Sequence, residues 1–372
     1  MSETYYLHLN VSRFELSLNG SLGQSVNITN GSDPNAANIY PDISYSLLTV
    51  LLLIMIATVA GNGIVLIAFC ASRRLKTPFN YYICNLALAD FLVGIIAMPG
   101  FIVYNLFNEV WPAGTALCTI WMYFDWHMTF ESAINLAAVS LDRYWSVRWP
   151  VSYKRHTSVK RTILILLATW LYMHIAFFPG YLYDRIVNVY GEHDCFWDLV
   201  MNRRFCTAVA VLGYYIPLSV MVFCNWSIGS MVVKRTNATA QDPDVAKKYA
   251  EGETRLTLAK DKARRQRQPL ITLAMITVCA VICWAPWVIY FTIAPHYPTA
   301  LPDILITVGY WMCYLNSTIN PYLYIATSDD FRGAIRDLFC RRSGQTLSGA
   351  FSMIISAAPK RTSLETSVRR AS

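Results

Sequence analysis

Long apolar segments alternate along the chain with short segments rich in polar and charged residues. A helix needs about 20 apolar residues to cross a bilayer, and seven segments have that length. They lie at approximately 46–71, 80–103, 115–140, 162–182, 205–233, 270–294 and 304–326. An amphipathic stretch follows the last one. The pattern predicts an all-α membrane protein, a seven-transmembrane helix bundle with a short amphipathic helix after the last span.

The same pattern divides the chain into regions. We expect an extracellular glycosylated N-terminal segment, the bundle with a third inner loop at about 234–268, the amphipathic helix and a cytoplasmic tail. Their ranges are 1–44, 45–327, 328–340 and 341–372.

Charge supports a membrane protein and sets its orientation. Charged residues make up 15% of the chain, against about 25% in soluble domains, which argues against a soluble enzyme. With the N-terminus outside, only four of the 31 bases (Arg13, Arg185, Arg203 and Arg204) lie in outer segments, and all others lie in inner ones. Basic residues favour the cytoplasmic side. The net charge of +8 therefore indicates a multi-pass plasma-membrane topology, and no nucleic-acid partner is expected.

Modification sites follow from this topology. Four N-glycosylation sequons fall in the outer N-terminal segment, at Asn10, Asn19, Asn27 and Asn30.

Three cysteines have distinct positions. Cys118 and Cys195 both lie on the outer side, where an oxidising compartment allows them to form a disulfide. Cys340 follows the amphipathic stretch beside Arg341 and Arg342, a position typical of palmitoylation. An ordinary free thiol is the alternative for Cys340.

Ionisable residues inside a bilayer are costly and point to function, and the spans hold three acids. Asp90 is accompanied at comparable depth by Ser132, Asn316 and Asn320, with Asn62 and Ser317 nearby. Oxygen-bearing side chains around a carboxylate suit Na⁺ or a water-filled polar network. A protonated Asp90 without an ion is the alternative. Apart from this sodium ion, no cofactor or metal is expected.

Asp125 lies two helical turns below the outer end of its span, and no span contains Lys or Arg to neutralise it. We expect a cationic ligand to do so, with proton uptake or water as the alternative. Trp faces are the best cation–π partners, and aromatic residues of the outer half-spans supply candidate ligand contacts at Trp126, Trp284, Trp287, Tyr310 and Tyr314.

The third acid, Glu131, is six residues from Asp125 and so faces away from it. His127 shares its helix face, and His174 of the fourth span is a further neighbour. A neutral, hydrogen-bonded Glu131 at a helix–helix contact is the expected role.

Motifs at the inner end of the third span, within the sixth span and at the end of the seventh carry a family resemblance. They are Asp142-Arg143-Tyr144, Cys283-Trp284-Ala285-Pro286 and Asn320-Pro321-Tyr322-Leu323-Tyr324. With seven spans and one motif per span in order, the chain resembles the rhodopsin-like G-protein-coupled receptors from about residue 46 to 340. This resemblance implies a receptor with no enzymatic activity.

Within that family the chain is most similar to aminergic receptors, which place an ammonium-binding carboxylate where Asp125 stands. The seventh span resembles that of muscarinic acetylcholine receptors, whose three capping tyrosines correspond to Trp126, Trp287 and Tyr310. Other positions depart from the muscarinic pattern at Val288 and, in the fifth span, at Val209, Ala210 and Gly213. A receptor for another biogenic amine (histamine-, serotonin- or trace-amine-like) and a constitutively active orphan receptor are the alternatives.

The resemblance also implies how the signal crosses. Arg143 pairs with Asp142 at rest and is released when the sixth span swings outward to admit a heterotrimeric G protein. Tyr144 and Tyr324 belong to this switch, and Val151 inserts into the G protein. Gln266 stands where the family usually has an acid, which predicts elevated basal signalling. Membrane lipid, arrestin and receptor kinases are further implied partners.

Two other classes fit less well. A transporter would show an internal repeat with broken helices in matching positions, and no such repeat is visible. An enzyme would need a nucleophile–base or metal constellation, and the membrane histidines His127 and His174 have no companion at ligand spacing beyond Glu131.

Overall fold

The computed structural model describes residues 45–107, 110–188, 190–191, 193–197, 202–240, 253–297, 300–302 and 304–341. Within these ranges only the backbone is described at 45, 235–240, 253–270, 272, 304, 306 and 339–341.

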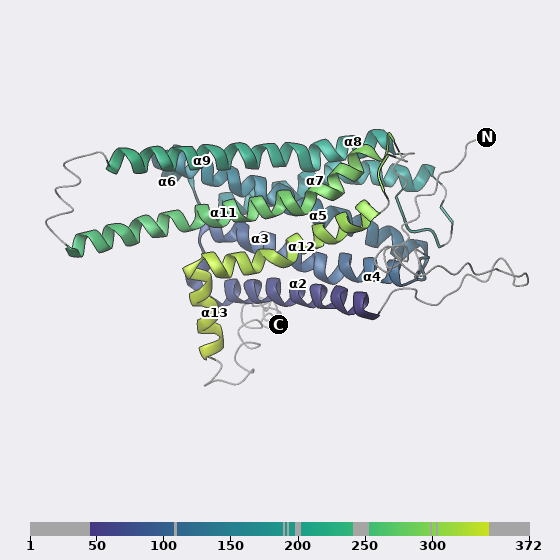
Figure 1. The fold of residues 1–372 in the computed structure, drawn as a ribbon, viewed down its shortest axis with the longest axis horizontal. Coiled ribbons are helices and arrows are strands. Elements are labelled where there is room, and N and C mark those ends of the chain that lie inside the picture. The colour runs from purple at the N-terminus through teal and green to yellow at the C-terminus, as the bar shows by residue number, and fades with distance from the viewer. Residues whose placement is uncertain are drawn as a thin grey trace, which may run out of the picture.

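The described chain is almost entirely helical, and seven long helical rods run side by side along one axis (Figure 1). The rods are α2 (Tyr45–Ala71), α3–η2–α4 (Pro78–Leu92, Val93–Ala97 and Met98–Leu106), α5 (Gly114–Arg148), α7 (Val159–Val187), α8–η3–α9 (Arg203–Ala210, Val211–Tyr215 and Ile216–Ala240), α11 (Glu253–Ile293) and α12 (Ile304–Thr327). Three short helices complete the fold: η1 (Arg73–Leu75), α6 (Pro150–His156) and α13 (Asp329–Arg341). The predicted seven-helix bundle, with a short helix after the last span, is confirmed.

The rods have two ends that differ in what they carry. The α13 end holds α6, α13 and the extended ends of α9 and α11, whereas α4 and α8 lie at the opposite end (Figure 1). That opposite end also carries the disulfide described below and is called the disulfide end. α5 packs against α3, α7, α9 and α11 and so occupies the middle of the bundle.

Five of the rods are long and apolar enough, by length and composition, to cross a membrane: α2, α3–α4, α7, α8–α9 and α11. The other two, α5 and α12, carry buried polar residues such as Asp125, Glu131, Asn135, Asn316 and Asn320. Their neighbours cover these faces, because α5 is central and α12 packs against α2, α3 and α11. A helix that is enclosed by protein can carry polar groups that a lipid-facing helix cannot.

Two rods contain a π-helical turn that ends two residues before a proline. η2 comes just before Pro99, and η3 ends two residues before Pro217. Proline has no N–H to give to the carbonyl four residues earlier, and a π turn accommodates the register change without ending the helix. Both rods therefore continue past their prolines, α3–η2–α4 toward the disulfide end and α8–η3–α9 toward the α13 end.

Several helices are longer than the predicted spans. α9 continues to Ala240 and α11 begins at Glu253, so both run through much of the range expected for the third inner loop. α13 packs on α2 and η1 with Phe331 and Ala334 buried, which is the apolar face that the amphipathic pattern predicts.

Candidate functional site

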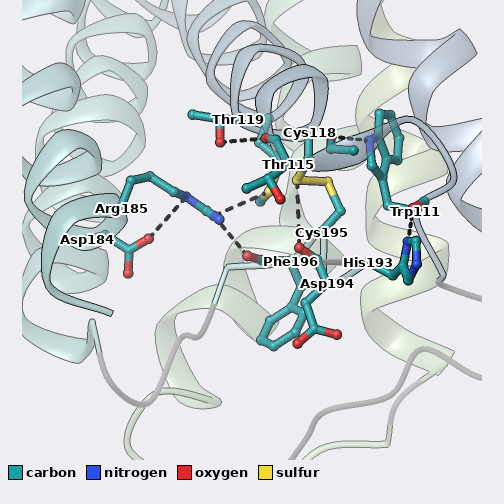
Figure 2. The surroundings of a disulfide bond; sticks show 12 residues. Trp111, Thr115, Cys118, Thr119, Asp184, Arg185, His193, Asp194, Cys195 and Phe196 are labelled. Carbon is teal, nitrogen blue, oxygen red and sulfur yellow. Dashed lines mark hydrogen bonds and ion pairs between the residues drawn. A yellow bond between two sulfur atoms is a disulfide. The ribbon is translucent and has the colours of Figure 1, made fainter. Parts of the chain in front are cut away.

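A disulfide joins the loop after α7 to the outer turn of α5. Cys118 and Cys195 are bonded, with their Cα atoms 5.6 Å apart, and the predicted pairing is confirmed. Beside the bond, the Trp111 amide donates to the carbonyl of His193 over 2.9 Å (Figure 2). The loop is thereby held against the disulfide end of the bundle.

Hydrogen bonds of Asp184 and Arg185 hold the other side of this loop. Asp184 is fully buried and accepts hydrogen bonds from Asn188, Tyr190 and Asn202. Its neighbour Arg185 donates to the carbonyl of Phe196 over 2.9 Å (Figure 2). Because Cys195 and Phe196 are fixed, the next residue, Trp197, is fixed above the aromatic side chains of α5.

Asp125 lies beneath this loop and is 4% exposed. The Tyr314 hydroxyl donates to its Oδ1 over 2.8 Å. Within the described ranges, no Lys or Arg lies at ion-pairing distance from Asp125. Within the part of the chain that the structure describes, the carboxylate therefore has one hydrogen bond and no cation.

Aromatic rings surround Asp125, and we call them the aromatic layer. All five predicted ligand contacts belong to it: Trp126, Trp284, Trp287, Tyr310 and Tyr314. The ring centroids of Trp126 and Trp287 are 5.5 Å apart, and those of Trp287 and Tyr310 are 6.2 Å apart. Trp126, Trp287 and Tyr310 thus form a chain of ring contacts across α5, α11 and α12.

Four further rings belong to the aromatic layer and were not predicted: Phe101, Phe130, Trp197 and Phe291. Phe101 stacks on Tyr310 at 4.8 Å, and Trp197 stacks on Trp126 at 5.2 Å. Phe291 stacks on Trp287 at 4.7 Å. Phe291 is four residues after Trp287, so helical spacing alone could have found it.

The wall of the aromatic layer on the α8–η3 side is built from small and apolar residues. Val209 and Ala210 are buried there. A Cβ atom placed on Gly213 would lie 2.6 Å from Cδ1 of Phe130. The Phe130 ring therefore occupies the space that a side chain at position 213 would fill. This wall offers an aromatic surface in place of a hydroxyl group.

Asp90 lies deeper in the bundle and is fully buried. Its carboxylate accepts hydrogen bonds from the Ser132 hydroxyl (3.0 Å), the Ser317 hydroxyl (2.7 Å) and the Asn320 amide (2.7 Å). These donors come from α5 and α12, so the network ties three rods together.

Two predicted neighbours of Asp90, Asn62 and Asn316, have no hydrogen bond to its carboxylate among the described contacts. The Asn62 amide donates to the carbonyls of Thr58 and Ser317. Asn316 is buried, and in the described part of the chain its amide forms no hydrogen bond. The Oδ1 atoms of Asn316 and Asn320 are also unpaired there. Unpaired oxygens beside a carboxylate fit a sodium ion or ordered water.

Glu131 faces α7, away from Asp125, as its position on the helix predicts. The Thr169 hydroxyl donates to Oε1 of Glu131 over 2.7 Å. His127 packs its ring against Trp170 and His174, and the Tyr123 hydroxyl hydrogen-bonds to His174 over 2.7 Å. These groups form a polar contact between α5 and α7.

At the α13 end, Arg143 is held by α3, α5 and α6. It forms an ion pair with Asp142, its Nε donating over 3.1 Å. It also donates to the Tyr153 hydroxyl over 2.7 Å and lies 4.4 Å above the Phe79 ring. Burial raises the pKa of Tyr153, so its hydroxyl stays protonated and donates to Asp142 over 3.0 Å. The sequence did not point to Tyr153.

The other predicted switch residues surround this cluster. Tyr324 is fully buried, and Val151 on α6 is 79% exposed. Tyr144 packs its ring against Trp149 and Phe223. Between α9 and α11, the Asn225 amide donates to the Thr277 hydroxyl over 2.9 Å.

Some predicted residues lie outside the described residues. They are the four sequon asparagines Asn10, Asn19, Asn27 and Asn30 and the side chains of Gln266 and Cys340. Their roles stay predictions.

Comparison with known proteins adds the context for this geometry. The profile of the 7 transmembrane receptor (rhodopsin family) matches residues 61–324. An octopamine receptor beta-2R from Chilo suppressalis is 27% identical over 86% of this chain and 88% of its own length. The 5-hydroxytryptamine receptor 4 of Cavia porcellus is 29% identical over 79% of each chain. The D(4) dopamine receptor of Mustela putorius furo is 27% identical over 75% of this chain and 87% of its own.

Proposed function

This chain belongs to the rhodopsin family of seven-transmembrane receptors, and from that premise we propose that it is a plasma-membrane receptor for a cationic amine. The family consists of receptors, which are not enzymes. We further propose that the N-terminus and the disulfide end face outward and that the α13 end meets a heterotrimeric G protein in the cytoplasm.

The observation that carries this proposal is the incomplete pairing of Asp125. A buried carboxylate is stable only when it is hydrogen-bonded, paired with a cation or protonated. Tyr314 supplies one hydrogen bond, and the described chain supplies no cation. A ligand ammonium would complete the pairing, with the rings of Trp126, Trp287 and Tyr310 as cation–π partners.

The residues on the α8–η3 side of the aromatic layer indicate the chemical character of the rest of the amine. Val209, Ala210 and Gly213 offer no side-chain hydrogen bond, and Phe130 covers Gly213. A polar ring substituent on that side would lose its hydrogen bonds to water without replacement. We therefore infer an amine whose body is apolar or aromatic. The relatives are named for octopamine, serotonin and dopamine, which makes biogenic amines the first compounds to test, with acetylcholine beside them.

The experiment is a panel in cells that express the full chain. Octopamine, serotonin, dopamine, histamine, noradrenaline, trace amines and choline esters are applied, and G-protein activation is read for wild type, Asp125→Asn and Glu131→Gln. A response that is lost in Asp125→Asn and kept in Glu131→Gln supports the proposal. A response that survives Asp125→Asn removes the pairing with the ammonium.

A constitutively active orphan receptor is the second candidate. Arg143 is held from α3, α5 and α6, and Gln266 on α11 carries no negative charge to add a restraint from that helix. Losing one charged contact shifts a two-state equilibrium on the scale of about 1–3 kcal/mol. High basal output without response to any amine, lowered by Gln266→Glu, would favour this candidate.

Secondary roles complete the proposal. Asp90, Ser132 and Asn320 would hold a sodium ion or its water, with Asn316 as a further oxygen donor. We also propose glycans at Asn10, Asn19, Asn27 and Asn30, a lipid anchor at Cys340, and arrestin and receptor kinases as partners. Mass spectrometry of the purified protein tests the modifications directly.

A further inference from the structure

A cavity of about 700 Å³ opens at the α13 end, between η1, α3, α5, α6, α12 and α13. It belongs to neither the aromatic layer nor the network at Asp90. Arg143 in its wall is eighteen residues from Asp125 on α5, roughly 27 Å along a helix that rises 1.5 Å per residue. The volume lies in the range of small-molecule sites, about 300–1,000 Å³.

Four arginines line this cavity: Arg74, Arg143, Arg332 and Arg336. Arg143 pairs with Asp142, Arg74 with Asp330 over 3.0 Å, and Arg332 with Asp329. Arg336 forms no ion pair within the described ranges.

The acidic residues that line the cavity do not neutralise its four arginines. Two acids line the cavity, Asp329 and Asp330, and about half of each side chain is exposed. Water screens exposed carboxylates strongly. The wall therefore keeps a surplus of positive charge.

Two helix N-termini add to that surplus. α3 begins at Pro78 and α13 at Asp329, and the first residues of both helices line the cavity. A helix N-terminus carries a partial positive charge and unpaired N–H groups, which favour anions.

The inner wall offers one more polar group beside apolar surface. Tyr324 lines the cavity and is fully buried, and its hydroxyl has no hydrogen-bond partner in the described chain. Phe79, Ile83 and Phe331 provide the apolar part of the wall.

We propose that this cavity binds a phosphate ester. Several guanidinium groups around one space match the oxygens of a phosphate group better than a single carboxylate, and the apolar wall accepts an organic body. Both a soluble phosphate ester and a phosphorylated lipid headgroup have this chemistry. The cytoplasmic location of the site rests on the proposed function, through the orientation of the bundle.

Such a ligand would contact the switch, because Arg143 and Tyr324 belong to the same wall. Its phosphate would compete with Asp142 for Arg143. Occupancy of the cavity is therefore expected to change the coupling between receptor and G protein.

The test uses the purified full chain in phosphatidylcholine nanodiscs, with fluorescent inositol 1,4,5-trisphosphate as the soluble probe. Arg336→Gln removes the unpaired base from an exposed position. Gly333→Met fills the cavity, and a Cβ there meets nothing nearer than the mobile end of Arg74 at 3.4 Å. Arg155→Gln is the matched control, since Arg155 is an exposed base at the same end but outside the cavity.

Wild type and Arg155→Gln should bind the probe alike, and each of the other two variants should bind about tenfold more weakly, the effect of one charged hydrogen bond. Equal binding by all four proteins would overturn the proposal.

A second experiment distinguishes a soluble phosphate ester from a phosphorylated lipid headgroup. Native mass spectrometry compares retention of phosphatidylinositol bisphosphate with that of phosphatidylcholine in the same four proteins. Retention lost only in Arg336→Gln and Gly333→Met, without binding of the soluble probe, identifies a lipid headgroup. Absence of both signals in wild type overturns the proposal. No amine or G protein is present, so a failed amine panel and a failed phosphate assay are distinguishable.

Discussion

Two of the buried aspartates, Asp90 and Asp125, differ in what the described chain supplies to each. Asp90 receives hydrogen bonds from Ser132, Ser317 and Asn320, whereas Asp125 receives one, from Tyr314. Hydroxyls and amides surround the first, and aromatic rings surround the second. The described chain largely satisfies Asp90, whereas we propose that a ligand from outside completes the pairing of Asp125.

This difference shows why two acids in similar membrane depth are not equivalent. A carboxylate with three donors can hold its charge within a polar network. A carboxylate with one donor among aromatic rings is stabilised most by a cation. We therefore expect substitutions at the two sites to separate ligand recognition from the internal network.

The largest expected effect is on ligand affinity in Asp125→Asn. Removing one partner of a buried ion pair costs about 3–5 kcal/mol, so radioligand competition with the best amine of the panel should show at least a hundredfold loss. Asp90→Asn is the control and should lose less than tenfold. Equal losses of affinity in the two variants would show that Asp125 and Asp90 do not differ in their contribution to ligand binding.

Next in size is the effect of Gly213→Ser on folding stability. The new Cβ would lie 2.6 Å from Phe130, and such overpacking costs about 1–3 kcal/mol. Gly229→Ser is the matched control in the same rod, because nothing lies within 4 Å of a Cβ there. Thermal unfolding of the purified receptor should show a lower Tm for the first variant only. Unchanged Tm for Gly213→Ser would mean that Phe130 does not form that wall.

Tyr314→Phe should have a moderate effect on affinity. It removes the hydrogen bond from Tyr314 to Asp125 and leaves the ring in place. A hydrogen bond to a charged group contributes about 1.5–3 kcal/mol. Amine affinity should fall about tenfold, with Tyr310→Phe as the matched control on the same helix face. An affinity that rises would show that Tyr314 competes with the ammonium for the carboxylate.

A smaller effect concerns sodium. If the network at Asp90 holds Na⁺, replacing sodium by N-methylglucamine should shift agonist affinity several-fold in wild type and not in Asp90→Asn. The readout is the ratio of affinities in the two salts. The same ratio in both proteins would remove sodium from the network while leaving its hydrogen bonds.

The smallest effect is expected from Glu131→Gln. Glu131 accepts a hydrogen bond from Thr169 on α7, and an amide oxygen can accept the same bond. Amine affinity should stay within threefold of wild type. A tenfold loss would place Glu131 in the ligand site and contradict its structural role.

Helical periodicity and charge predicted much of this arrangement. The apolar segments gave the spans, the absence of Lys and Arg from them singled out Asp125, and positions on the outer side gave its five aromatic neighbours and the Cys118–Cys195 pair. Phe101 and Trp197 were missed because contacts between rods, or between a rod and a loop, leave no regular spacing in the sequence. Phe130 is four residues after Trp126 on α5, so helical spacing could have found it. Trp197 joins the layer only because the disulfide and Arg185 fix its loop.

The α13 end was predicted less fully. The motif identified Asp142 and Arg143, yet the hydroxyl that holds Arg143 comes from Tyr153 on α6, an ordinary residue of an inner loop in the sequence. The cavity with its four arginines forms from six separate elements, and no local pattern brings these residues together.

The central claim is that Asp125 binds the charge of the ligand, and a double-mutant cycle tests it most directly. The affinities of the active amine and of its isostere with carbon in place of nitrogen are measured on wild type and Asp125→Asn. The account predicts that the amine loses at least a hundredfold and the isostere changes less than threefold, a coupling of about 2 kcal/mol or more. Equal losses for both compounds, and hence a coupling near zero, would contradict it.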